Sequence, residues 1–146
     1  MKVLAETTPD LAPAGPPALS LHFAAGLVGF PDHQRGEIFH IPEQLPFQWL
    51  RLHGPDPLHF VVIDPVGLVA DYHPELFDDD ASVLGIMSAD DALVFNIVTV
   101  RGQEPTTATA NLVGPVIVNR HTGAARQVVI ANHSSYSARH PLVTAS

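Results

Sequence analysis

The sequence contains no cysteine, which excludes disulfide bonds, thiolate metal ligands and cysteine nucleophiles. Basic residues are scarce, because seven Lys and Arg stand against 15 Asp and Glu and give a formal net charge of −8. Direct binding of nucleic acid or of an anionic membrane requires clustered Lys and Arg, so we expect neither. The charge is compatible with a basic protein partner, although an acidic excess often serves only solubility.

Long hydrophobic runs are also missing. No apolar stretch approaches the roughly 20 residues that a membrane-spanning helix requires. Glu6 and Asp10 interrupt the apolar stretch near the N-terminus, so we do not expect a secretory signal. A composition of 46% hydrophobic and 15% charged residues over 146 positions is typical of a globular chain. We therefore expect a cytoplasmic protein with one folded domain, acting as a monomer.

The first 17 residues differ from the rest in composition. Pro9, Pro13, Pro16 and Pro17 stand among alanines and small polar residues, which can neither continue a β-ladder nor bury a face. We interpret residues 1–17 as a mobile Pro/Ala-rich tail and residues 18–146 as a single domain.

Most of that domain has the pattern of short strands. Alternating or β-branched segments are separated by Gly, Pro and Asp turns, which is typical of an all-β barrel or sandwich. We predict a small, partly open, antiparallel β-barrel-like domain of eight or nine short strands. The expected strands cover residues 19–23, 37–41, 45–52, 58–63, 68–76, 92–100, two segments within 107–119, and 127–130.

One short helix is expected over residues 81–86. Asp78, Asp79 and Asp80 precede it, where a carboxylate can cap the free amide groups of a first turn. Gly85 stands where a helix can stop, because glycine readily adopts a left-handed backbone conformation.

Residues 107–119 read as strand, break and strand. Gly114 and Pro115 interrupt the pattern, and a β-branched run follows from Val116 to Val118. Asn111 occupies a position where a plain strand favours a β-branched or aromatic residue. We therefore expect its amide group to fasten the neighbouring backbone.

The nine histidines suggest an alternative, a β-barrel enzyme or a metal or small-ligand binder. A hairpin could set His53 and His59 across from each other, but a third ligand from His22, His40 or His73 would be needed for zinc or iron. No local metal-ligand spacing, G-x-S-x-G elbow or isolated pair of carboxylates is present. We expect no catalytic residue and no metal, which leaves a binding protein.

A set of motifs together resembles the flagellar assembly factor FliW family, over residues 21–140. The order and spacing of the motifs are specific in combination. They are F-x-x-G-L-x-G-F at 23–30, P-F-x-x-L at 46–50, F-V-V-I-D-P at 60–65, D-Y at 71–72, N-I-V-T-V at 96–100, T-A-N-L-x-x-P-V-I-V-N at 109–119, Q-V-V at 127–129 and Y-S-x-R-H at 136–140.

The resemblance implies a non-enzymatic, barrel-like protein without a cofactor. Proteins of this family bind newly made flagellin, and when flagellin is exported they are free to bind the carbon storage regulator CsrA. CsrA is a basic dimer that represses flagellin translation, so free FliW relieves the repression. Val28, Pro31, Arg51 and Leu52 depart from the family pattern in loops that could contact a partner.

Two groups of residues are candidates for partner binding. An amphipathic helix of flagellin would require an apolar groove, for which Phe30, Phe47 and Trp49 are candidates, with core packing as the alternative role. A basic regulator would require an acidic surface, for which we nominate Asp78, Asp79 and Asp80. Their alternative role is a solvated helix start.

Overall fold

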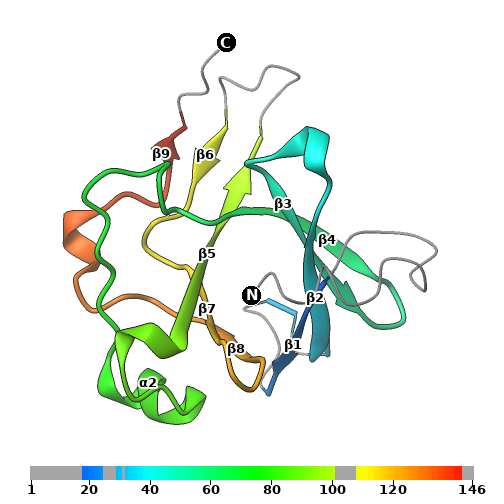
Figure 1. The fold of residues 1–146 in the computed structure, drawn as a ribbon, viewed down its shortest axis with the longest axis horizontal. Helices are drawn as coiled ribbons and strands as arrows, with labels where there is room; N and C mark the ends of the chain where they lie inside the picture. The colour runs from blue at the N-terminus through cyan, green and yellow to red at the C-terminus, as the bar shows by residue number, and fades with distance from the viewer. Residues whose placement is uncertain (1–17, 25–28, 31, 101–107, 143–146) are drawn as a thin grey trace.

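The computed structural model describes residues 18–24, 29–30, 32–100 and 108–142. Within this part of the chain lie nine strands and one short α-helix, which confirms the predicted all-β fold (Figure 1). The proposed tail at 1–17 and the departures at Val28 and Pro31 lie outside the described residues. The strands are β1 Leu19–Phe23, β2 Arg35–His40, β3 Gln48–His53, β4 Leu58–Ile63, β5 Ala92–Thr99, β6 Thr109–Ala110, β7 Val116–Asn119, β8 Ala124–Gln127 and β9 His140–Pro141.

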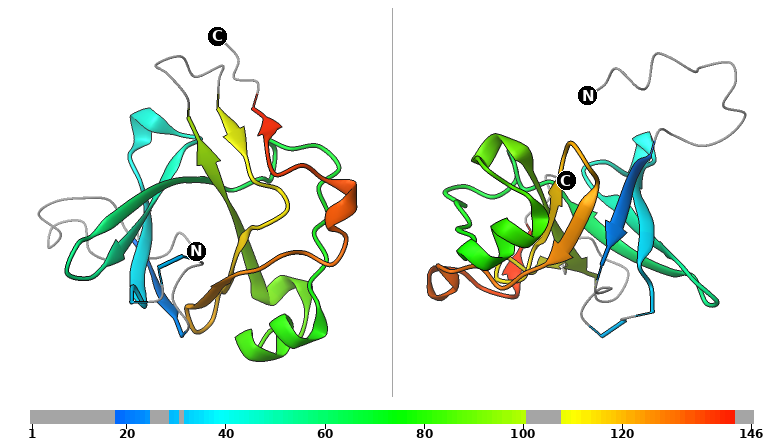
Figure 2. Two further views of the ribbon diagram at one scale, coloured as in Figure 1. Left: turned by 180° about the vertical axis from the view of Figure 1, so that it is seen from behind. Right: turned by 90° about the horizontal axis from the view of Figure 1, so that it is seen from below.

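Seven of these strands close into a barrel. Their order is β4-β3-β2-β1-β8-β7-β5, and the ring closes where β4 pairs with β5. All these pairings are antiparallel except that of β1 with β8, which is parallel and spans two residue pairs. The strands β6 and β9 extend from the far half of β5. Viewed from below, β1 to β4 form one side of the molecule and the helix α2 lies on the other (Figure 2).

Every second side chain along the strands points into the barrel and fills its interior. Inward-facing residues of the strands form one apolar cluster in which Phe23, Leu50 and Leu52 are fully buried. A second cluster joins Ile63 and Val98 to β6, and a third packs Leu84 of the helix against Ile117 of β7. The helix therefore covers part of the outer face of β5 and β7.

The hairpin of β3 and β4 is confirmed, with Leu52 opposite Leu58 across the Gly54–Pro57 turn. The strand β3 begins at Gln48, later than expected, because Pro42–Gln44 form a 3-10 turn before it. The strand β2, in contrast, begins at Arg35, two residues earlier than expected.

The predicted edge strand at residues 68–76 is wrong. After Ile63 the chain turns, with Leu68 and Val69 both donating backbone hydrogen bonds to the carbonyl of Pro65. Asp71 adopts φ of 56°, which no strand residue does. Residues 64–77 instead run along the outside of the barrel from the end of β4 to α2 (Figure 1). We call residues 64–77 the crossing segment.

The helix α2, Asp78–Leu84, begins three residues earlier than predicted. Phe77 is its N-cap residue and no side chain caps it, so the expected Asp cap is wrong; the three Asp residues lie within the first turn. Their charges still favour that end of the helix dipole. Gly85 ends the helix with φ of 72°, as predicted.

The break within 107–119 is confirmed for the described residues 108–119. Oδ1 of Asn111 accepts hydrogen bonds from the backbone of Val113 (3.0 Å) and Gly114 (2.9 Å). The return strand, however, covers Ala124–Gln127 and not 127–130. Beyond it the chain bonds to the break itself, since Val128 donates to the carbonyl of Pro115.

Candidate partner-binding surface

A tyrosine anchors the crossing segment on β5. The hydroxyl of Tyr72 donates to the carbonyl of Leu112 (2.6 Å) and accepts a hydrogen bond from Nδ2 of Asn96 (3.1 Å). Burial raises the pKa of Tyr72 above its ordinary value, so the phenol stays protonated and can donate. The ring also meets Tyr136 edge to face, with the centroids 4.9 Å apart.

Further along, the crossing segment is held by the chain near the C-terminus. The hydroxyl of Tyr136 accepts a hydrogen bond from the amide of His73 (2.9 Å) and donates to the carbonyl of Asp71 (3.1 Å). The side chain of Asn132 bonds the backbone of both His73 and Glu75. Tyr136 also packs against the second and third core clusters, so the crossing segment has a fixed position over β5.

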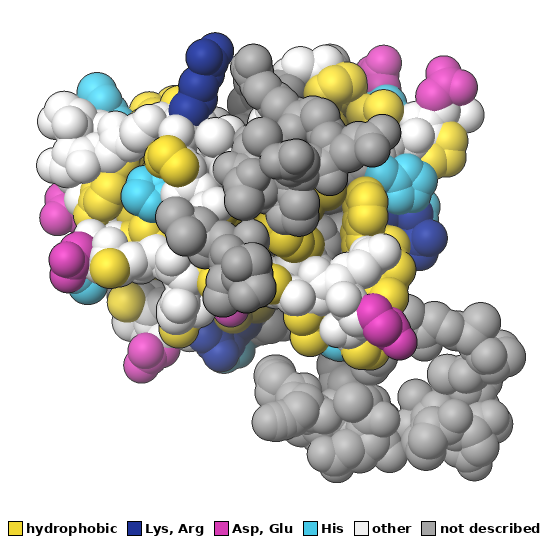
Figure 3. Space-filling model, turned by 90° about the horizontal axis from the view of Figure 1, so that it is seen from above, with side chains coloured by type: hydrophobic (Ala, Val, Ile, Leu, Met, Phe, Trp, Pro, Cys, Tyr) yellow, Lys and Arg dark blue, Asp and Glu magenta, His cyan; other side chains and the backbone are white. Residues whose placement is uncertain are grey.

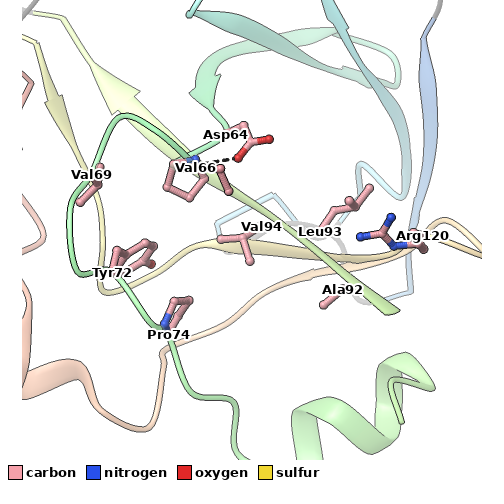
Figure 4. Close-up of a pocket in the computed structure, with 10 residues that line it drawn as sticks. Asp64, Val66, Val69, Tyr72, Pro74, Ala92, Leu93, Val94 and Arg120 are labelled. Carbon is pink, nitrogen blue, oxygen red and sulfur yellow. Dashed lines mark hydrogen bonds between the residues drawn. The ribbon is translucent and has the colours of Figure 1, made fainter. Parts of the chain in front are cut away.

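A groove lies between the crossing segment, the first half of β5 and the residues that follow α2. Its first part, about 300 Å³, lies between the start of the crossing segment and β5 (Figure 4). Its second part, about 570 Å³, reaches Ile86 and Met87 after the helix. The two parts share Tyr72, Pro74, Ala92 and Val94, so we treat them as one surface, the β5 groove.

The β5 groove exposes apolar side chains. Met87 and Val66, one in each part of the groove, keep 92% and 84% of their surface in contact with water. Phe77, half-exposed, follows the lining residue Leu76. Solvated apolar side chains around a concave surface are typical of a site that a partner covers.

The segments that form the walls of the β5 groove are rich in acidic residues. Residues 64–91 contain eight carboxylates and no Lys or Arg. Asp64 lines the groove, while Asp71, Glu75 and Asp90 are exposed next to lining residues. Arg120 is the one Lys or Arg among the described residues that line it. Charge and apolar exposure thus coincide on this surface. The complete set of acids is Asp64, Asp71, Glu75, Asp78, Asp79, Asp80, Asp90 and Asp91.

Asp91 fixes the turn between α2 and β5. Its carboxylate accepts hydrogen bonds from the amides of Met87 and Ser88, both 3.0 Å, and lies 3.0 Å from the imidazole of His121. These bonds, that from Met87 foremost, hold the pKa of Asp91 below its ordinary value. The exposed Met87 is therefore presented by an ordered turn.

The nominated aromatic residues do not line the β5 groove. Phe30 packs on the barrel core, with its ring 5.7 Å from that of Phe60. Phe47 packs against the cluster around Ile63, and Nε1 of Trp49 donates to Gln44 (2.7 Å). All three are partly buried, and none of them lines the groove, although Phe47 packs in the same cluster as the lining residues Val69 and Tyr72. Their role in binding stays a prediction.

Asp78, Asp79 and Asp80 lie in α2, next to the groove. Asp78 and Asp79 are exposed, whereas Asp80 is less exposed and pairs with Arg126 of β8 at 3.4 Å. Met87, Val66 and Ile86 are lining residues that the sequence pattern did not predict. A signal was available, namely isolated apolar residues in a stretch with acids and no basic residue.

The histidine alternative finds no support in the described geometry. Nε2 of His53 lies 2.8 Å from Glu37, which also pairs with Arg51, while His59 stands opposite Arg51 in the ladder. Among the described residues no three His, Asp or Glu side chains come close enough together to hold a metal ion.

On the end of the molecule near β6 and β9, Lys and Arg side chains are few and acidic side chains lie around the margin (Figure 3). Within the described ranges, no helix is long and apolar enough to cross a membrane.

The fold and groove together define a class of small β-barrel with an acidic, partly apolar surface of the kind that docks proteins.

Comparison with known proteins gives the family. The model of the FliW protein family matches residues 13–142, so the chain belongs to the FliW family of flagellar assembly factors, a non-enzymatic class. The flagellar assembly factor FliW of Natranaerobius thermophilus is 34% identical over 120 residues, covering 82% of this chain and 79% of that protein. That of Bacillus subtilis is 35% identical over 121 residues, covering 82% of each chain. A crystal structure of the flagellar assembly factor FliW superposes with a TM-score of 0.77 at 27% identity and covers 87% of each chain.

Proposed function

We propose that this protein binds flagellin and, when free of it, binds and antagonises the translational regulator CsrA, so that repression of flagellin synthesis is relieved. Membership of the FliW family supports a role in flagellar assembly. We further propose that the protein acts in the cytoplasm, where flagellin is made before export.

The observation that carries this proposal is the β5 groove. It combines water-exposed apolar side chains, Met87 and Val66, with the lining carboxylate of Asp64 and exposed acids next in sequence to other lining residues. Apolar contacts supply binding free energy, and complementary charge raises the rate of association with a basic protein. A surface with both features suits protein partners better than a small metabolite.

The proposed regulation is a pair of linked equilibria. Flagellin and the regulator compete for this protein, so the concentration of unexported flagellin sets how much protein remains free for the regulator. When flagellin is exported, more protein is free and more regulator is bound. No catalytic step is required.

Calorimetric titration and co-elution of the purified full chain with flagellin and, separately, with the regulator test the proposal. We expect heat and a stable complex with each partner. Complex formation with neither would contradict it. For the basic regulator, the association rate should also fall steeply with salt, because the attraction between exposed charges is screened over about 10 Å at 0.1 M salt.

A further inference from the structure

The first half of β5 has a free edge inside the β5 groove. Asp91 accepts a hydrogen bond from Arg120, and Ile97 accepts one from Asn111, both through their backbone carbonyls at 2.9 Å. Because backbone groups alternate in direction along a strand, the odd-numbered residues of β5 face β7 and β6. The backbone groups of Ala92, Val94, Asn96 and Val98 therefore point to the opposite side.

Only part of that opposite side is paired. Strand β4 covers Asn96 and Val98, which stand opposite Ile63 and Val61. The same register would place residue 65 opposite Val94, and residue 65 is a proline without an N–H group. The chain turns at Pro65, so the ladder stops after Ile63.

Three backbone groups are consequently left along the groove. Among the described residues, the N–H of Val94 and the carbonyls of Val94 and Ala92 have no backbone hydrogen-bond partner. Both residues line each part of the groove. Figure 4 shows Ala92, Leu93 and Val94 along β5, with the turn at Asp64 and Val66 over them. An unpaired strand edge is a ready template for an added strand.

We propose that the partner docks here as an extended basic peptide segment that adds a strand to β5 at Ala92–Val94. Main-chain hydrogen bonds to Val94 and Ala92 would fix the segment, as in other cases of strand addition. Alternate side chains would meet apolar residues of the groove, including Val66 and Met87.

Charge complementarity indicates the composition of the segment. Asp64 lines the groove, and the exposed Asp71, Glu75 and Asp90 are sequence neighbours of lining residues, whereas Arg120 is the one Lys or Arg among the described lining residues. Lys or Arg residues that flank one or two apolar residues match this pattern. A helical segment would cover the apolar side chains but would leave the backbone of Val94 unbonded, because a helix satisfies its own hydrogen bonds.

The inference rests on the proposed function and is tested on the same complexes. The test is amide hydrogen exchange, followed by NMR on the full chain, alone and saturated with full-length flagellin or regulator. In the free protein we expect Val94 to exchange faster than Leu93 and Phe95, whose amides face β7. In one of the complexes the exchange of Val94 should slow by about tenfold or more, while Leu93 and Phe95 change little.

A complex that forms with each partner but leaves the exchange of Val94 unchanged would overturn strand addition and leave the proposed function standing. Failure of both partners to bind would overturn both. The variant Val94→Pro provides a second test, because it removes an N–H that the free protein does not use in a ladder. Val94→Ala is its matched control, since it also removes the isopropyl group that packs near Ile117 but keeps the N–H. Val94→Pro should fold and bind at least about tenfold more weakly than Val94→Ala, whereas equal affinities of the two folded variants would contradict the proposal.

Discussion

The hydroxyl of Tyr72 lies 3.1 Å from Nδ2 of Asn96, a side chain of β5 that is fully buried. The same Nδ2 donates to the carbonyl of Asn111 at 3.0 Å. One amide group thus joins the crossing segment, the barrel and the break before β7. The position of one wall of the β5 groove depends on this connection.

We expect Tyr72→Phe to destabilise the fold by about 1–3 kcal/mol, because buried groups of Asn96 and Leu112 lose a hydrogen-bond partner. Urea unfolding measures the loss. Tyr136→Phe is the matched control, since it also removes a hydroxyl with two hydrogen-bond partners, but these hydrogen bonds are exposed to water. A loss for Tyr72→Phe no larger than for the control would contradict the anchoring role.

Asn111 should be structural. The variant Asn111→Ala leaves the amides of Val113 and Gly114 without their acceptor and should lower the free energy of unfolding by about 1–3 kcal/mol. Asn111→Asp keeps an acceptor oxygen and should retain more of the stability. Thermal unfolding and calorimetric affinity are measured on both. An Asn111→Ala chain with normal melting but no partner binding would overturn this assignment.

Met87 should contribute to binding without contributing to folding. It is 92% exposed, so Met87→Ser should change stability by less than about 0.5 kcal/mol. Loss of its apolar contact should weaken partner affinity by about fivefold or more. Val129→Ser is the control, since Val129 is 56% exposed and does not line the groove. Equal affinities for wild type, Met87→Ser and Val129→Ser would place the partner on another surface.

Stability should fall on acidification partly through Glu37. Burial opposes ionisation of this carboxyl, but hydrogen bonds from His53 and Arg51 outweigh it and hold its pKa below the ordinary value of 4.5. A lowered folded pKa stabilises the protein fully above about pH 4.5, and this stabilisation disappears as pH falls through the folded pKa.

Glu37→Gln should therefore reduce the difference in unfolding free energy between about pH 6 and about pH 3. Glu43→Gln, at an exposed acid of the 3-10 turn before β3, is the control. Urea unfolding at both pH values gives the two differences. If the acid-dependent loss in Glu37→Gln equals that of wild type, the pairing of Glu37 does not contribute to the pH dependence.

The strands that the sequence predicted well are those whose local pattern agrees with their environment. The segment 58–63 and the β-branched run at 92–99 have this agreement, and both lie in the barrel as expected. The strand prediction for residues 68–76 was wrong because Leu68, Ala70 and Tyr72 have the alternation of a strand without forming one. A turn at Pro65 and the hydrogen bonds of Tyr72 and Tyr136 determine their path instead, and these involve residues 40 or more positions away.

The groove was harder to predict for the same reason. Its walls come from the crossing segment, from β5 and from residues 86–89, which meet only once the barrel closes. The sequence shows that Phe30, Phe47 and Trp49 are apolar, but it does not show whether each side chain is exposed for binding or packed. In the structure all three are partly buried. The free edge of Val94 also follows from a proline 29 positions earlier, through a register that the sequence does not state.

The most direct test of the account is a calorimetric competition experiment on the full chain. The regulator is titrated into the protein alone and into the protein saturated with flagellin. We predict clear binding of the regulator in the first titration and strongly reduced binding in the second. Met87→Ser should weaken the binding of each partner that uses the β5 groove. Binding of the regulator that flagellin does not reduce, or no binding of either protein, would contradict it.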